Sequence, residues 1–87
     1  MFEWDDGNVD HLAEHGVAPT EAEEAFADRR GFSVPAYSTP TEQRGALVGA
    51  TEDGRVLFVV YTQRGTRIRI VTARDADPAF RRRDRRR

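Results

Sequence analysis

The sequence contains no cysteine, no lysine and no long apolar run. Without cysteine the chain forms neither a disulfide framework nor a thiolate metal site, so we expect a protein of the reducing cytoplasm. No apolar stretch approaches the roughly 20 residues of a membrane-spanning helix. The first ten residues are acidic, where a signal peptide would be basic and then apolar. The sequence therefore predicts a soluble chain without a membrane segment.

The charges are divided between the two parts of the chain. Residues 1–28 hold nine of the fifteen acidic residues and no arginine, whereas residues 29–87 hold all fourteen arginines and six acids. A charge of −9 is thus followed by one of +8, which gives the net charge of −1. Guanidinium is planar, always charged and binds phosphate through paired hydrogen bonds. The exclusive use of arginine fits phosphate recognition, and it fits equally well a codon bias against lysine.

The length of 87 residues predicts one domain, residues 1–87, without a linker or internal repeat. A chain of this size is near the lower limit for a self-sufficient core, so a stabilising partner is expected. Helix signals come first and strand signals afterwards. This order predicts an α+β fold, with two N-terminal helices packed on a twisted antiparallel sheet and a short C-terminal helix.

Two helices are predicted in the acidic part of the chain. The first begins at Asp6 or Asn8, either of which can cap it, and it stops at Gly16. The second has Pro19 at its first position and Thr20 as the acceptor of a capping box. Both helices carry their acids on the outside, so most of the negative charge lies on them.

Strands are predicted in the remaining segments. Residues 2–4 form a short strand, and residues 32–37 form an edge strand because they include a proline. An acidic turn ending in glycine joins residues 46–51 to residues 55–62, and a further turn leads into residues 67–74. These last three strands make an antiparallel meander whose central strand is the second. Four of its residues are expected to be buried, namely Leu57, Val59, Ile68 and Ile70.

The last strand, residues 67–74, carries the strongest candidate site. Its two-residue alternation places Arg67 and Arg69 on one face, away from the helices, because the apolar residues between them must face the core. Arg64 lies in the turn before the strand, and Arg74 ends the strand with the opposite parity. At that end Arg74 either reaches around the sheet edge or pairs with Asp75 or Asp77. A solvated strand face is the alternative explanation for these arginines.

Four segments, in this order, resemble the BrnT-type toxins of bacterial type II toxin-antitoxin systems. They are "FEWD" at 2–5, "HGV" at 15–17, "TEDGRVLFVVYTQRG" at 51–65 and "RIRIVTAR" at 67–74. The resemblance implies a small RelE-like fold and endoribonuclease activity without a metal or another cofactor. It also implies RNA as the substrate and a ribbon-helix-helix antitoxin as the protein partner. Operator DNA would be contacted only by the antitoxin.

The resemblance also implies roles for individual residues. Arg64, Arg67, Arg69 and Arg74 are expected to stabilise the charge of the phosphoryl group, and His15 is the candidate for proton transfer. The alternative for His15 is stabilisation of a helix C-terminus, and for Arg74 it is a structural ion pair. No metal is expected, since two histidines one turn apart with only acids nearby make a poor site.

Further residues are candidates for RNA binding, namely Arg44, Tyr61, Arg81 and Arg82, and Tyr37 and Phe80 are further aromatic rings for base stacking. The arginine tail, residues 81–87, has three interpretations. It binds the RNA backbone, it docks on the acidic helices of the same or another chain, or it is a disordered solubilising end.

The chain departs from the family pattern in ways that support a second hypothesis. Glu14 stands where the family usually has a basic residue, and His11 stands where it has asparagine. Gly45 replaces an aromatic residue after Arg44, and Phe80 replaces a glutamate of the last helix. The alternative function is therefore a catalytically silent protein that binds a DNA-binding antitoxin as its partner or co-regulator.

Overall fold

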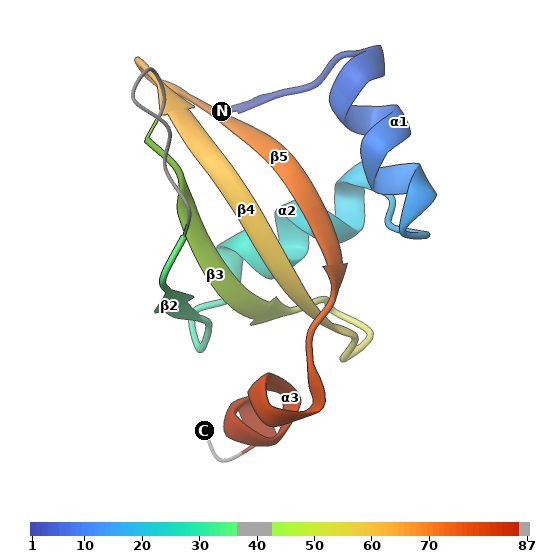
Figure 1. Cartoon of the computed structure of the whole chain (residues 1–87), viewed down its shortest axis with the longest axis vertical. Helices are drawn as coiled ribbons and strands as arrows, with labels where there is room; N and C mark the ends of the chain where they lie inside the picture. The colour runs from blue at the N-terminus through green and yellow to red at the C-terminus, as the bar shows by residue number, and fades with distance from the viewer. Residues whose placement is uncertain (37–42, 86–87) are drawn as a thin grey trace.

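The structure, a computed structural model, describes residues 1–36 and 43–85. Its elements are β1 (Phe2–Glu3), α1 (Asp6–Glu14), α2 (Pro19–Ala27), β2 (Phe32–Val34), β3 (Gly45–Ala50), β4 (Val56–Arg64), β5 (Arg67–Asp75) and α3 (Pro78–Arg85). The strands form one twisted sheet in the order β1-β5-β4-β3-β2, with α2 running behind it and α3 below it in Figure 1. The predicted α+β architecture is confirmed.

The sheet contains the predicted meander and one strand pairing that the sequence did not indicate. Strands β3, β4 and β5 are antiparallel, with β4 at the centre, and β2 is an edge strand as its following proline predicted. In contrast, β1 runs parallel to β5, with Phe2 opposite Ile68 and Glu3 opposite Arg69. The sheet is therefore mixed rather than purely antiparallel. This pairing joins the two distant parts of the chain, and no local pattern encodes it.

A bulge in β5 changes which side chains share a face. Tyr61 pairs with Ile70, but the preceding residue Val60 pairs with Thr72, so Val71 is passed over. A bulge residue shifts the alternation of the strand by one position. Counting positions along the strand predicted that Arg74 and Arg69 point to opposite faces of the sheet. This prediction is wrong, because the bulge lets both side chains leave the same face.

Helix α1 begins earlier in the chain than either predicted cap, Asp6 or Asn8, would place it. Its N-cap is Asp5, whose carboxylate accepts a hydrogen bond from the backbone N–H of Asn8 at 3.2 Å, while the Asn8 side chain accepts one from Asp5 at 2.8 Å. The Asn8 amide also donates to the carbonyl oxygens of Glu3 and Ile70, at 3.0 and 3.1 Å. Asn8 is thus not the cap but a buried residue that ties α1 to β1 and β5.

Helix α2 begins at Pro19 as predicted, but Thr20 does not cap it. Proline at the first helical position makes the preceding residue, Ala18, the N-cap. The Ala18 N–H donates to the Glu21 carboxylate at 3.0 Å, so one half of a capping box forms without a capping side chain.

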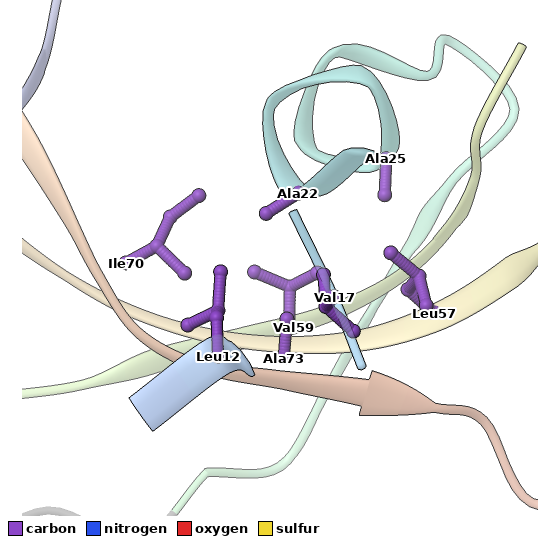
Figure 2. Packing of buried hydrophobic residues seen from close by; sticks show 8 residues of the cluster. All are labelled: Leu12, Val17, Ala22, Ala25, Leu57, Val59, Ile70 and Ala73. Atoms are coloured by element: carbon purple, nitrogen blue, oxygen red, sulfur yellow. The ribbon is translucent and has the colours of Figure 1, made fainter. Parts of the chain in front are cut away.

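The core lies between α1, α2 and the sheet. Figure 2 shows its eight residues, which are Leu12, Val17, Ala22, Ala25, Leu57, Val59, Ile70 and Ala73. Three of the four residues predicted to be buried have no exposed surface, and Ile68 is half-buried. Helix α2 approaches β3 so closely that a Cβ on Gly49 would overlap the carbonyl oxygen of Ala25. None of the helices in the described ranges is long and apolar enough to cross a membrane.

Candidate functional site

One surface of β4 and β5 is turned away from α1 and α2, and we call it the distal face. Leu57, Val59 and Ile70 point into the core, so the alternate residues of these strands point outwards. The strand register places facing pairs on the distal face, namely Arg64 with Arg67, Thr62 with Arg69, Val60 with Thr72 and Phe58 with Arg74. Arginines therefore lie at both ends of the two-stranded ribbon.

Arg69 is held by two carboxylates. Its guanidinium contacts both Asp5 oxygens, at 2.8 and 3.2 Å, and a Glu3 oxygen at 3.5 Å. The hydrogen bonds from Arg69, with that from the Asn8 backbone, lower the pKa of Asp5, and the contact with Asp5 raises the pKa of Arg69. Only 18% of the Arg69 side chain is exposed. Arg69 thus fastens β5 to the start of α1, and its charge is compensated.

Arg67 differs from its neighbours because its charge is not compensated. Arg64, which lies opposite, contacts Glu3 at 3.4 Å. The Arg67 side chain is exposed, and within residues 1–36 and 43–85 it makes no hydrogen bond or ion pair with any side chain. Among the described residues, the end of the ribbon near the β4–β5 turn therefore presents the unpaired Arg67 cation beside Arg64, Arg69 and the Glu3 carboxylate that contacts both of them.

Arg74 lies at the other end of the distal face. Its guanidinium carbon is 5.1 Å from the centre of the Phe58 ring, which is a cation–π contact. Of the alternatives predicted for Arg74, the ion pair with Asp75 does not form, because Asp75 points to the opposite face and is bound by Arg55 at 2.7 and 3.2 Å. Arg55 also binds Glu21 at 3.1 Å. Its hydrogen bonds are the main cause of the lowered pKa of Asp75.

Helix α3 covers the sheet beside Arg74 with aromatic contacts. The Phe80 ring is 6.3 Å from the Phe58 ring and nearly parallel to it, and it is also 6.3 Å from the Phe32 ring. Arg83 lies over Phe32 at 4.0 Å. Of the two predicted RNA-binding arginines of this helix, Arg81 is half-buried and Arg82 is exposed.

The structure does not bring His15 to the arginines. His15 is the C-cap of α1, whereas Arg69 contacts Asp5 at the N-terminal end of the same nine-residue helix. A helix of that length spans about 14 Å. The exposed His15 ring is 5.5 Å from that of His11. This position fits the alternative interpretation, in which histidine stabilises the end of the helix.

Two further candidates lie outside the arginine cluster. Tyr61 points to the core side of the sheet, where its ring packs edge-on against Phe26 at 5.0 Å, so it is not available beside Arg67. Arg44 is half-buried and directly precedes β3. The predicted stacking residue Tyr37 lies outside the described residues.

Glu3 and Asp5 are the residues that sequence reasoning missed. The alternation of Phe2 and Trp4 towards the core indicates that Glu3 points the other way. Its proximity to Arg64 and Arg69, however, depends on the parallel pairing of β1 with β5. In the described part of the chain, no group of three or more histidine, aspartate or glutamate residues is arranged to hold a metal ion.

An open cleft of about 450 Å³ lies on the helix side of the sheet, away from the arginines. Three glutamates are among its lining residues, which are Phe2, Thr20, Glu23, Glu24, Ala27 and Glu52. Two of the carboxylates are already engaged, Glu23 by the Trp4 indole N–H at 2.7 Å and Glu24 by the Glu52 backbone N–H at 3.1 Å. An acidic cleft is unsuited to RNA, so the distal face remains the candidate site.

Comparison with known proteins identifies the family of the chain. The family model described as "Ribonuclease toxin, BrnT, of type II toxin-antitoxin system" matches residues 4–79, which is most of the chain. No curated protein matches the chain significantly. The matched range includes both N-terminal helices and strands β2 to β5, and it begins directly after β1. The chain therefore belongs to the BrnT family of ribonuclease toxins of type II toxin-antitoxin systems.

Proposed function

We propose that this protein is an endoribonuclease toxin that cleaves RNA without a metal ion, inhibits translation and is neutralised by a ribbon-helix-helix antitoxin. The observation that carries the proposal is the exposed, uncompensated Arg67 on the distal face, next to a cluster in which Glu3 contacts Arg64 and Arg69. Free cationic charge fixed on a strand is suited to a phosphate, because it is oriented before the substrate arrives.

In the proposed reaction the ribose 2′-hydroxyl attacks the adjacent phosphorus. A bond forms between the 2′-oxygen and phosphorus, and the bond from phosphorus to the 5′-oxygen breaks, which leaves a 2′,3′-cyclic phosphate and a 5′-hydroxyl. Arg67 donates two hydrogen bonds to the equatorial oxygens, where negative charge grows in the transition state. Arg64, on the facing strand, adds a second positive charge.

Glu3 is the proposed acceptor of the 2′-hydroxyl proton. Its side chain is 23% exposed, and its carboxylate contacts Arg64 at 3.4 Å and Arg69 at 3.5 Å. These contacts hold the carboxylate in place beside the phosphate that Arg67 binds, which is the geometric requirement for a general base. Water supplies the proton for the leaving 5′-oxygen. Arg69 acts through Glu3 and is a positioning residue in this scheme.

The antitoxin is proposed to cover the distal face. Blocking the surface that binds RNA is a direct route to neutralisation, and a chain of this size gains stability from a partner that binds only the folded state. Replacing both Arg67 and Arg69 with glutamate should weaken RNA binding and antitoxin binding together. Unchanged antitoxin affinity in calorimetry would show that the two ligands use different surfaces. Operator DNA is contacted through the antitoxin.

The test of the proposed function is single-turnover cleavage of a defined RNA by saturating protein in the presence of EDTA. We expect cleavage products ending in a 2′,3′-cyclic phosphate, and their loss in Arg67→Ala. Cleavage that requires added metal would contradict the proposed chemistry.

One observation supports a second candidate, the catalytically silent binding protein. Phe80 stands where the family tends to have a glutamate, and its ring packs between Phe58 and Phe32, so α3 contributes no acid at this position. Absence of RNA cleavage by the wild type, together with tight antitoxin binding and no toxicity on induced expression, would favour this candidate.

A further inference from the structure

We propose that Arg74 and Thr72 form a second site for the RNA backbone, at the end of the distal face remote from Arg67. The site would hold a phosphate several nucleotides from the cleaved bond and would set how much RNA the protein needs for tight binding. The inference rests on the proposed function for the substrate class, but the binding it predicts does not depend on cleavage.

The bulge at Val71 creates this site. In a regular strand, residues 67, 69, 71 and 73 would share a face, and Arg74 would point to the core side. Because Val71 is passed over, Thr72 pairs with Val60 and Arg74 pairs with Phe58, both on the distal face. Bulges re-aim side chains, often next to functional sites. Here the bulge adds one hydroxyl and one guanidinium to the face that already carries Arg67.

The charge of Arg74 is available to a ligand. Its side chain is exposed, and within the described residues no carboxylate pairs with it. The nearest acid in sequence, Asp75, is bound by Arg55 on the other face. The guanidinium carbon lies 5.1 Å from the centre of the Phe58 ring. The N–H groups of the Arg74 guanidinium make no hydrogen bond with the described residues, so they can bind phosphate oxygens in paired hydrogen bonds.

Arg74 lies at the end of a row of apolar residues that crosses the sheet, and its contact with Phe58 in that row positions its side chain. Four residues lie in register across the sheet, in the order Arg74, Phe58, Val48 and Phe32. Phe80 from α3 packs against both rings of this row. Three strand spacings separate the ends of the row, which is about 14 Å. Arg83 lies over Phe32 at the far end, so a second guanidinium marks the continuation of the basic surface onto α3.

The distance from Arg67 to Arg74 predicts a dependence on RNA length. The two residues are separated along β5 by about 20 Å, at the usual rise per residue of a strand. Between them the distal face is formed by Thr72, Val60 and the buried Thr62, which carry no charge. An RNA that fills only the Arg67 end therefore cannot reach Arg74, whereas a longer strand can contact both ends.

The test uses fluorescein-labelled 2′-O-methyl RNA, which cannot be cleaved because its 2′-oxygen is blocked. Strands of three and twelve nucleotides are compared, and their binding is measured by fluorescence anisotropy over a salt series. In Arg74→Gln we expect roughly tenfold weaker binding of the longer RNA, as for loss of one charge-assisted contact. The slope of log affinity against log salt should fall by about 0.7. Arg74→Lys should keep the slope, and affinity for the short RNA should not change. Arg30→Gln, an exposed arginine after α2, is the control.

Each other outcome has a definite meaning. If Arg74→Gln weakens binding of both RNA lengths equally, or of neither, the second site is overturned. It is also overturned if Arg74→Gln weakens binding of the antitoxin but leaves RNA affinity unchanged. If the wild type binds the longer RNA through Arg74 but never cleaves natural RNA, the proposed catalytic function fails and the second site stands. If the wild type binds neither RNA, both proposals fail.

Discussion

Replacing Arg67 with glutamine should inactivate the protein and stabilise it at the same time. Arg67 lies directly opposite Arg64 at the end of the β4–β5 hairpin, and both side chains leave the distal face. Like charges in directly facing positions of an antiparallel pair destabilise it. The proposed phosphate site needs such a concentration of positive charge, so we expect it to lower the folding stability.

The size of the stabilisation follows from this arrangement. Facing pairs contribute roughly 0.2–1 kcal/mol, and the Glu3 contact to Arg64 offsets part of the repulsion. We therefore expect a gain of about 0.5 kcal/mol, which corresponds to a rise in Tm of about 2–4 °C for a domain of this size. At 1 M salt, where the screening length is about 3 Å, the gain should disappear. Cleavage should fall by about two to three orders of magnitude, as for loss of one donor to a transition-state oxyanion.

The measurements are thermal unfolding by circular dichroism at low and high salt, and single-turnover cleavage. A double-mutant cycle with Arg64→Gln separates repulsion from other effects, because removing the second charge should add less than removing the first. Arg30→Gln should change neither quantity. A fall in Tm above about 4 °C for Arg67→Gln would mean that Arg67 holds the fold together. Unaltered cleavage would mean that it is a solvated strand residue.

Three further predictions follow from the contacts. Glu3→Gln should raise RNA affinity, because a negative charge is removed, and lower the cleavage rate; equal cleavage would exclude Glu3 as the base. Hydrogen bonds from Arg55 hold the pKa of Asp75 below its ordinary value of 3.8. The stability that these hydrogen bonds contribute is therefore present above pH 3.8 and is lost as the pH falls through the lowered pKa. Arg55→Gln should therefore lose stability less steeply than the wild type in urea unfolding from pH 5 to 2, and parallel curves would refute this. Gly49→Ala should destabilise the fold by about 2 kcal/mol through overpacking against α2, and an unchanged Tm would contradict the close approach.

Some candidate residues were placed wrongly although the sequence held the necessary signal. Tyr61 has the same parity as Leu57 and Val59 in one regular strand, so its packing against the core side follows from the alternation that located those two residues. Likewise, a proline at the first position of α2 makes the residue before it the cap, which excludes Thr20.

The sequence by itself determined the helices, the meander and most of the core, because these depend on residues close together in the chain. Apolar periodicity, Pro19 and the glycine turns act over a few positions and predict the same elements that the structure contains. The charge division is also a property of the sequence, and the strand prediction placed Arg67, Arg69 and Arg74 on the last strand, where the structure has them.

Only the tertiary structure decided which of those arginines are free. The parallel pairing of β1 with β5 brings Glu3 and Asp5 to Arg69, and the bulge at Val71 turns Arg74 onto the face of Arg67. A pairing between residues more than sixty positions apart, and a shift of one residue within a strand, leave no local pattern in a single sequence. The physical reason is that the effective charge of a side chain depends on what lies opposite it in space, which is settled only when the strands pair.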